Sequence, residues 1–395
     1  MWHLPSQSFH LFKLTDLREM YAAEMIKFLS LGLVGIFIPI YLYTKGVPLT
    51  LIIAFLLWST ILQIGAAWLG GSLIPKYGVK HLLGASFILA FAYLLALAAF
   101  NQVWVLFAVI APLYAVAESF HSVAYHYEFS KVKDADHSGQ QLSNVTIMVH
   151  LAAAIGPFLG GVIGAIYGLQ MTLFVCLGLM VLGIGPLFAT RDIKPRHKLD
   201  MSKISLMKIK NDLISYSGRG LEYVVTLLVW PLFMFLFLGS LVEVGAVTTV
   251  ALMLTLFASY FIGRLTDRGY RARLIRIGSI SNAMANVARM LVTGLGSILA
   301  VNIFSDITRA IVRIAWGAQY YSNADRHSRL EYIVAMELAA YSGRVLLFAA
   351  MLAASIVASA KAIFIAAFAV TALGMLLVMK IDQKAKRTKI YVGHY

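Results

Sequence analysis

Twelve long apolar runs occupy most of the sequence, and they set its fold class. A helix needs ~20 predominantly apolar residues to cross the hydrocarbon core of a bilayer. The runs of sufficient length are 20–44, 50–73, 80–100, 102–128, 139–167, 169–190, 211–239, 242–262, 272–294, 296–321, 330–358 and 360–381. We therefore expect an all-α integral membrane protein with twelve transmembrane helices.

The composition agrees with a chain that lies in a membrane. Of its 395 residues, 60% are hydrophobic and 13% are charged, and the mean hydropathy is +0.81. A soluble chain of this size is closer to half apolar and a quarter charged. The one cysteine, Cys176, rules out an intramolecular disulfide. The first residues lack the basic cluster, apolar core and cleavage site of a signal peptide.

The basic residues predict the orientation of the chain. A net charge of +15 is compatible with nucleic-acid binding, but these residues lie in short connectors, and only in alternate ones. Lys45 and Lys361 are the basic residues of the connectors on one side, whereas the other connectors and both tails are rich in lysine and arginine. Such residues favour the cytoplasmic side. We expect cytoplasmic termini, a bilayer environment and no nucleic-acid partner.

The longest connector divides the runs into two groups of six. "GGSLIPKYGVKHLL" (70–83) follows the second run, and "GRLTDRGYRARLI" (263–275) follows the eighth at an offset that also places Pro39 on Pro231. Two parallel six-helix halves are a known transporter plan. The expected parts are a cytoplasmic N-terminal segment (1–19), a six-helix bundle (20–190), a cytoplasmic central loop (191–210), a second six-helix bundle (211–382) and a cytoplasmic basic tail (383–395).

These repeated loops carry a family resemblance. The first resembles the loop motif of the major facilitator superfamily, G-x-L-x-D-R-x-G-R-K, with Pro75 in place of the aspartate; the second copy keeps that aspartate. The matching residues are Gly71, Gly78 and Lys80 in the first copy, and Gly263, Asp267 and Arg268 in the second. "GPFLGG" resembles the G-P-x-x-G-G antiporter motif of the same family, through Gly156, Pro157, Gly160 and Gly161.

The resemblance implies a fold and a way of working. Helices 1, 4, 7 and 10 would line a central cavity, and two bundles would rock around it. The loop motifs would form a cytoplasmic gating latch, in which Asp267 meets basic residues or a helix end. The family's R-x-x-x-G motif is absent from helix four, but Arg313-x-x-x-Gly317 in helix ten looks similar. The "GPFLGG" glycines have two interpretations, close helix packing or a conformational role typical of exporters.

Ionisable residues mark the four helices that the resemblance places at the cavity. Each helix carries an acid and a base three residues apart, a spacing that puts both on one helix face. Charge at mid-membrane depth costs at least ~2.5 kcal/mol per residue, so such residues usually face the bundle interior. The candidate cavity residues on these four helices are Glu24, Lys27, Tyr114, Glu118, His121, Arg219, Glu222, Asp306, Arg309 and Arg313, and run 330–358 adds Glu337 and Arg344 on one face.

Each charged group has more than one interpretation. A pair three residues apart can neutralise itself and do nothing more. Arg313 adds a positive charge that could attract an anionic substrate group or pair with Glu118 or Glu337. Burial raises the pKa of carboxyl groups and histidine titrates near neutrality, so Glu118 and His121 are candidates for proton coupling. The alternative for His121 is a hydrogen-bonded packing role.

Other polar residues lead to further expectations. His126 and Glu128 lie nearer the cytoplasmic mouth, where we expect them to be solvated. Run nine carries a stripe with helical spacing that should face its own half, with a dimer contact as the second choice. This stripe comprises Asn282, Asn286, Arg289 and Thr293. Glu118-x-x-His121 matches half of a di-iron motif, but no second copy lies in the spans. We therefore expect no bound metal and no cofactor.

The sequence favours a transporter over an enzyme or a scaffold. It has no nucleophile elbow or phosphate-cradling loop, and its connectors leave no room for a soluble domain. We expect a monomeric secondary transporter that moves a small organic solute by alternating access, as a proton-coupled antiporter or exporter. The alternative is a proton-coupled uptake symporter for an organic anion, followed by a non-transporting receptor. Short loops are typical of a prokaryotic inner membrane.

Overall fold

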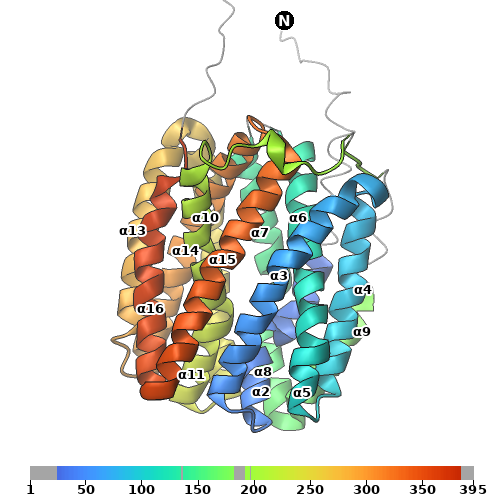
Figure 1. Ribbon diagram of the computed structural model, residues 1–395. Helices are drawn as coiled ribbons and strands as arrows, with labels where there is room; N and C mark the ends of the chain where they lie inside the picture. Colours follow the sequence, from blue (N-terminus) through green and yellow to red (C-terminus); the bar gives the residue numbers. More distant parts are fainter. Residues whose placement is uncertain (1–24, 135–136, 182–191, 196, 384–395) are drawn as a thin grey trace, which may run out of the picture.

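The computed structural model describes residues 25–134, 137–181, 192–195 and 197–383 (Figure 1). Within these ranges the chain is helical, without strands. Nine helices there are long and apolar enough to cross a membrane, with α12 and α13 counted as one. These are Met25–Thr44, Leu49–Tyr77, Val79–Ala98, Val103–Val132, Lys210–Leu238, Leu241–Arg289, Leu295–Ala324, Arg329–Ile356 and Ala360–Lys380. The chain is thus a multi-pass membrane protein.

Two of these spans contain the π-helical turns η3 (Leu106–Ile110) and η7 (Val225–Val229), and the span Leu241–Arg289 is kinked at η8 (Thr266–Tyr270), where Gly269 has a non-helical φ of 94°. The elements are α2 (Ile38–Thr44), α3 (Leu49–Tyr77), α4 (Val79–Ala98), α5 (Val103–Val105), η3 (Leu106–Ile110), α6 (Ala111–Val132), α7 (Ser138–Ala153), α8 (Gly156–Tyr167), α9 (Leu169–Met180), α10 (Lys210–Val224), η7 (Val225–Val229), α11 (Trp230–Leu238), α12 (Leu241–Leu265), η8 (Thr266–Tyr270), α13 (Arg271–Arg289), α14 (Leu295–Ala324), α15 (Arg329–Val357) and α16 (Ala360–Leu377).

Most predicted runs contain one helix, but run 139–167 does not. It consists of two helices, α7 and α8, which are interrupted at residues 154–155. Pro157 stands in the first turn of α8. A proline lacks the N–H that helix continuation needs, and it disfavours helical geometry in the preceding residue. The expectation of one uninterrupted span in this run was therefore wrong.

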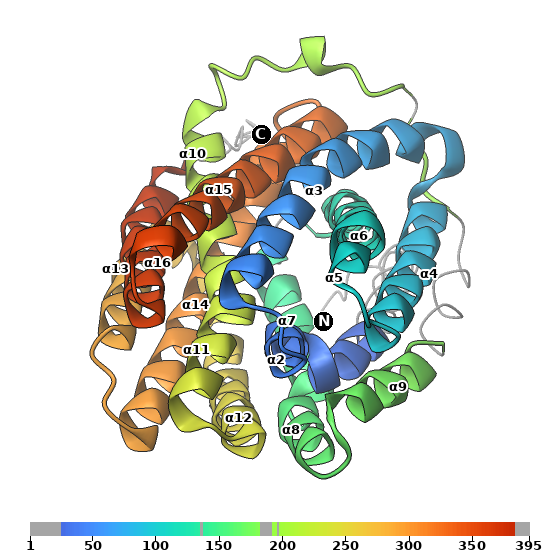
Figure 2. The same ribbon diagram turned by 60° about the horizontal axis from the view of Figure 1, so that its bottom comes forward.

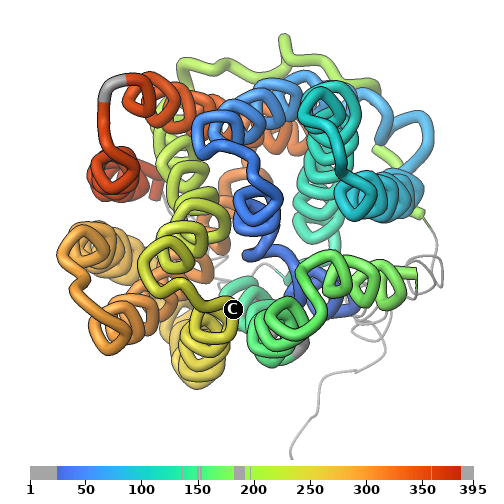
Figure 3. Tube along the Cα trace, turned by 90° about the horizontal axis from the view of Figure 1, so that it is seen from below, coloured from blue at the N-terminus to red at the C-terminus, as the bar shows by residue number. Residues whose placement is uncertain are grey.

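The helices gather into two groups that meet along two seams. In the first group α3 and α4 pack on α6, and α9 packs on α4; in the second, α12 and α13 pack on α14, and α10 packs on α15 and α16. At one seam α3 lies beside α15 (Figure 2), and at the other α12 lies beside α7 and α8 (Figure 3). Side chains that meet at these seams connect segments far apart in the sequence.

Glycines allow close contact between helices of the second group. A Cβ atom at Gly343 of α15 would lie 2.5 Å from the backbone oxygen of Ser217 in α10. Gly218 of α10 is similarly close to the backbone of Gly374 in α16. Small residues let helix backbones approach in membranes, where dispersion contacts provide much of the attraction. This packing holds α10, which carries several of the candidate residues, against α15 and α16.

The connector before α10 is docked across one end of the molecule, at the top in Figure 1. The Asp192 carboxylate accepts a hydrogen bond from the backbone N–H of Lys80 at 2.8 Å and hydrogen bonds with His81 Nδ1 at 2.6 Å. Further along, the N–H of Asp200 donates to Glu331 of α15 at 3.1 Å. We call residues 192–195 and 197–204 the docked connector, since they join the first turns of α4 and α15.

Gly78 allows this docking and provides a test of it. Its φ of 103° and ψ of 163° lie in a region essentially restricted to glycine. A Cβ atom there would also overlap the Asp192 carboxylate. We expect Gly78→Ala to destabilise the folded protein by about 1–3 kcal/mol, measured as a lower melting temperature in detergent.

Gly65→Ala is the matched control for this prediction. Gly65 lies within α3, and no heavy atom of the neighbouring described residues comes within 4 Å of the point where an alanine Cβ would stand. Alanine is favoured over glycine in a helix interior, so the melting temperature should hold or rise. Equal melting temperatures for the two variants would contradict the docking of Asp192 at Gly78.

Candidate functional site

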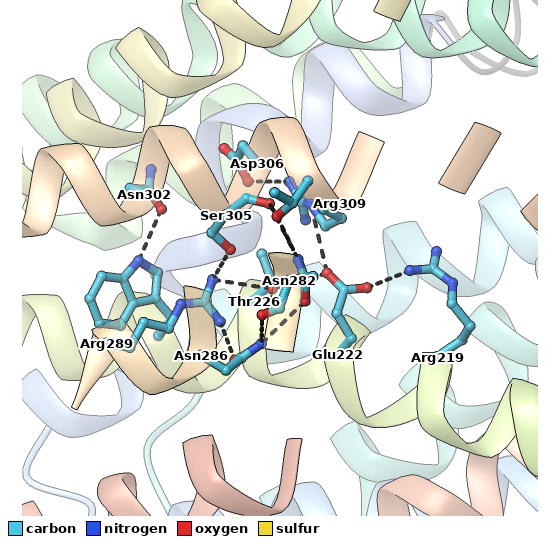
Figure 4. A network of polar contacts seen from close by, with 12 residues as sticks. Arg219, Glu222, Thr226, Asn282, Asn286, Arg289, Asn302, Ser305, Asp306 and Arg309 are labelled. Carbon is cyan, nitrogen blue, oxygen red and sulfur yellow. Dashed lines mark hydrogen bonds and ion pairs between the residues drawn. The ribbon is translucent and has the colours of Figure 1, made fainter. Parts of the chain in front are cut away.

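Helices α10 and α14 bring a group of charged side chains together inside the second helix group (Figure 4). Arg219 donates to Glu222 at 2.7 Å within α10, and Arg309 donates to Asp306 at 2.7 Å within α14. Between the helices, Arg309 Nε lies 3.9 Å from Glu222 Oε1. The predicted pairs on these two helices are thus formed, and Glu222 joins them into one network.

Arginines and carboxylates of this network differ in exposure. The side chains of Arg219 and Arg309 are 15% and 14% exposed, whereas Glu222 and Asp306 are 2% and 4% exposed. The two carboxylates are therefore more deeply buried than the guanidinium groups that contact them. Arg313, one turn after Arg309, is half-buried and interacts electrostatically with both arginines and both carboxylates. We call Arg219, Arg309 and Arg313 the arginine face.

Arg289 supports this network from α13. It is fully buried and donates to Ser305 Oγ at 2.7 Å, to Asn286 Oδ1 at 2.9 Å and to Thr226 Oγ1 at 3.4 Å. Its guanidinium also lies 5.0 Å from the centre of the Trp230 ring, a cation–π distance. Asn282 reaches Thr308 at 3.1 Å. Asn282, Asn286 and Arg289 therefore face their own helix group, as the helical spacing indicated, whereas Thr293 lies beyond the end of α13 and is exposed.

A second charged cluster lies where the two helix groups meet. Tyr223 of α10 donates to Glu118 Oε1 of α6 at 3.1 Å. Lys27, His121 and Arg344 are close enough to Glu118 to interact with it electrostatically. Glu118 is half-buried whereas Lys27, His121 and Arg344 are buried, so the most exposed charged group of this cluster is a carboxylate, in contrast to the arginine face.

Arg344 sits between aromatic rings within this second cluster. Its guanidinium carbon lies 4.5 Å from the centre of the Tyr223 ring and 4.8 Å from that of Tyr341. NH1 of Arg344 donates to Gln63 of α3 at 3.5 Å. Tyr114 stacks obliquely on Tyr93, with ring centres 5.2 Å apart, and interacts electrostatically with Glu118.

Glu337 forms a third junction between the groups. It accepts hydrogen bonds from Ser122 of α6 at 2.8 Å and from Tyr216 of α10 at 2.9 Å, and it lies 3.6 Å from His126 Nε2. His126 in turn hydrogen bonds with Tyr321 of α14 at 2.6 Å. Glu337 is thus held by neighbours from α6 and α10.

Glu128 was expected to be solvated, but it is 2% exposed, and that expectation was wrong. Glu24 lies outside the described residues, so its pairing with Lys27 stays a prediction. Among the described residues, no three His, Cys, Asp or Glu side chains gather as a metal site requires.

Several residues at the site were not anticipated from the sequence. Tyr216, Gln63 and Ser122 each contact a predicted charged residue, and Tyr223 links Glu118 to α10. A signal did exist for the tyrosines, because 216 and 223 lie three before and four after Arg219. That spacing places them on the same helix face.

The second loop motif contacts a helix end, one of the two arrangements expected for it. Both Asp267 oxygens accept backbone N–H groups at the start of α7, from Gly139 at 2.8 Å and from Gln140 at 2.7 Å. A carboxylate is favoured there because a helix N-terminus carries partial positive charge. Gly263 keeps α12 close to α7, since its Cβ would lie 2.5 Å from that of Ser143. Arg268 occupies the same turn, η8.

In the first loop motif, where Pro75 replaces the acid, the docked connector makes comparable contacts. Gly71 lies against Val334 of α15 and Leu199 of the connector. The backbone of Lys80 is held by Asp192, and the Lys80 side chain is buried. A carboxylate thus accepts backbone N–H groups at the start of each of the two helices, α4 and α7. At α4 the carboxylate comes from the docked connector.

The "GPFLGG" glycines are in close helix contacts. Gly156 meets the backbone of Gly32, and Gly160 meets that of Leu33. Gly161 approaches the backbone of Leu241 at the start of α12, and the backbone oxygen of Pro157 lies against Gly245. The packing role of these residues is therefore visible. An apolar crevice of about 340 Å³ borders the same helices at Leu29, Leu33, Leu151 and Leu159, away from the charged residues.

Asp267→Asn tests the contact between η8 and α7. An amide has one acceptor oxygen and no charge, so it cannot satisfy both N–H groups as the carboxylate does. Hydrogen bonds to charged groups contribute about 1.5–3 kcal/mol, and we expect a lower melting temperature in detergent. Asp200→Asn is the control, because that exposed carboxylate bonds only Ser202 among the contacts that the structure describes. An equally small effect of both changes would contradict the latch geometry.

Comparison with known proteins relates this geometry to a family. No curated protein sequence matches the chain significantly. The crystal structure of the human organic anion transporter MFSD10 (TETRAN) is similar, with a TM-score of 0.68 at 12% sequence identity, covering 93% of this chain and 99% of that one. At this identity the likeness shows the fold. The family model of the Major Facilitator Superfamily matches residues 20–238, more than half of the chain. The chain therefore belongs to the Major Facilitator Superfamily.

Proposed function

We propose that the protein is a proton-coupled secondary transporter that moves a small organic solute by alternating access, in the direction of export. The observation that carries this proposal is the hydrogen bond from Tyr223 to Glu118. It joins an ionisable, half-buried carboxylate of the first helix group to the second group. Secondary transporters work by moving one bundle against the other around a site near the membrane midplane.

Protonation of Glu118 would change the attraction between the groups. The charged carboxylate attracts Lys27, His121 and Arg344, and it accepts the Tyr223 hydrogen bond. Charge-assisted hydrogen bonds are roughly twice as strong as neutral ones, so a proton on Glu118 weakens this junction. A proton on Glu118 would then favour separation of the groups, and a substrate that binds the joined state would oppose it; such opposing effects of proton and substrate are the requirement for antiport. His121 would share the proton through its proximity to Glu118.

The proposed architecture consists of twelve spans as two six-helix bundles, 20–190 and 211–382, around a shared cavity. In this arrangement the docked connector belongs to the central loop, and both termini are cytoplasmic. The contact of Asp267 with α7 would close the cytoplasmic end and open in the alternate state. Its partners, Gly139 and Gln140, belong to the other bundle. We further propose a monomer in the cell's inner or plasma membrane.

The second candidate function is proton-coupled uptake of an organic anion. It is favoured by the arginine face, in which the guanidinium groups are more exposed than the carboxylates. Both candidates use the same cavity and differ in the direction in which proton and solute move. Solute uptake driven by an inward proton gradient would select uptake, and solute exit driven by the same gradient would select antiport.

Glu118→Gln tests the coupling role. A thermal-shift screen first identifies a ligand, because a ligand that binds only the folded state raises its stability. Flux of that ligand is then measured in proteoliposomes with and without a pH gradient. One pH unit corresponds to about tenfold in solute ratio per coupled proton. We expect the variant to lose this gradient-driven accumulation while it retains exchange of labelled for unlabelled ligand.

Glu243→Gln is the matched control for the coupling test. Glu243 is a carboxylate in the first turn of α12, away from the Glu118 cluster. This variant should accumulate ligand as the unaltered protein does. Normal gradient-driven accumulation by Glu118→Gln would refute the coupling role. A loss of coupling in both variants would show that the effect is not specific to Glu118.

A further inference from the structure

We propose that four exposed arginines at the junction of α12 and α13 bind the headgroup of an anionic phospholipid. These residues are Arg264, Arg268, Arg273 and Arg276, and we call them the basic rim. The inference goes beyond the proposed transport function, because it does not depend on the solute, on the direction of transport or on the proton.

The basic rim lies at one end of a membrane-spanning helix. With 25 residues and a rise of 1.5 Å for each, α12 is about 37 Å long, which exceeds the ~30 Å of the hydrocarbon core. Its last residues and the turn at η8 therefore reach the level of the lipid headgroups. The Tyr260 ring, whose centre lies 4.7 Å from the Arg264 guanidinium carbon, agrees with this depth, because tyrosines are enriched at membrane–water interfaces.

Exposed apolar side chains continue the helix faces on which the rim stands. On α12, Phe261 is 63% exposed and lies one turn before Arg264. On α13, which lies at the outer edge of the molecule (Figure 2), Ile277 and Met284 are exposed and share a helix face with Arg273. Each helix thus presents apolar side chains at the depth of acyl chains and an arginine at the depth of headgroups.

The described part of the chain does not neutralise the charge of the rim. Asp267 is the one acid between residues 260 and 280, and its two oxygens accept the N–H groups of Gly139 and Gln140. The ion pairs of the described residues include no arginine of the rim. Arg271, by contrast, turns inward and donates to the backbone oxygen of Ala318 at 3.4 Å. The rim therefore presents positive charge outward.

The first loop motif has an anion at the aligned position. At the offset between the two loop motifs, His81 corresponds to Arg273. His81 and the backbone N–H of Lys80 bind the Asp192 carboxylate of the docked connector. The ion pairs of the described residues bring no carboxylate to Arg273. In the second motif, an anion from the membrane would occupy the place that the connector fills in the first.

Arginine is suited to a lipid phosphate. A guanidinium group carries five N–H donors, and its planar fork matches phosphate oxygens. Clusters of four to eight basic residues beside the end of a transmembrane helix bind anionic lipids, with about fivefold in affinity for each residue. A zwitterionic headgroup has the phosphate but no net charge, so the rim should discriminate against it.

Dioleoyl phosphatidylglycerol and dioleoyl phosphatidylcholine are suitable probes, because they have the same acyl chains and different headgroup charge. The full chain in nonionic detergent is titrated with each lipid, and the melting temperature is measured against the mole fraction of lipid in the micelles. A lipid that binds only the folded state raises its stability. We expect the phosphatidylglycerol midpoint to lie at least about tenfold below that of phosphatidylcholine, and the difference to shrink in about 0.5 M salt, because exposed charges are screened.

Arg268→Gln combined with Arg273→Gln locates the site. The phosphatidylglycerol midpoint should rise about tenfold or more, while the melting temperature without lipid should hold, since neither residue forms an ion pair with the described residues. Lys203→Gln combined with Lys208→Gln is the matched control: it makes the same change in net charge at exposed positions and should leave the midpoint unchanged. Where the double arginine variant does not fold, Arg273→Gln alone should raise the midpoint about fivefold.

Equal midpoints of the two lipids with the unaltered protein overturn the proposal. An equal effect of the arginine and lysine variants, whether a loss of binding or none, also overturns it, because the charge would then act without a defined site. The same stabilisation by inorganic phosphate or glycerophosphate in the absence of lipid would assign the rim to a soluble anion instead. Solute flux does not enter this experiment, so each outcome leaves the proposed transport function unaffected.

Discussion

The cost of charge at membrane depth governs the interior of this protein. Every ionisable side chain in a span must find a partner, an aqueous space or a ligand. Arg289 satisfies this demand by donating to neutral acceptors and by its contact with the Trp230 ring, whereas Glu222 does so with two arginines. The helices are held in register by these contacts as well as by close packing at glycines. The positions of α10 and α14 therefore depend on the same groups that would meet a substrate.

The sequence predicted the parts of the fold that depend on local patterns. Apolar length located the helices, and the spacing of three residues placed Arg219 with Glu222 and Asp306 with Arg309. Hydropathy did not reveal the break before Pro157, because the residues around it are as apolar as the helices. Glu128 was misjudged for a related reason: its depth along α6 was readable from the sequence, but the tertiary packing that buries it was not.

Contacts between helices were the part that the sequence did not provide. The spacing along α6 shows which residues share a face with Glu118, but it contains no information on how α10 is rotated beside it. For this reason Tyr223 was missed although it follows Glu222 directly. The link from Glu337 to Ser122 and Tyr216 likewise joins three helices. Such contacts depend on the tertiary arrangement, which is not encoded in any local pattern of the sequence.

The docked connector has a practical consequence for protein engineering. Loops between groups of helices are common places to divide a chain or to insert a reporter, because exposed loops tolerate insertion. Here Asp192 is bound at the start of α4, and the backbone of residue 200 is bound at the start of α15. A division of the chain inside this segment would assign these anchors to different fragments. The turn at Gly46, by contrast, has open space between it and the other described residues and is the better position for a tag.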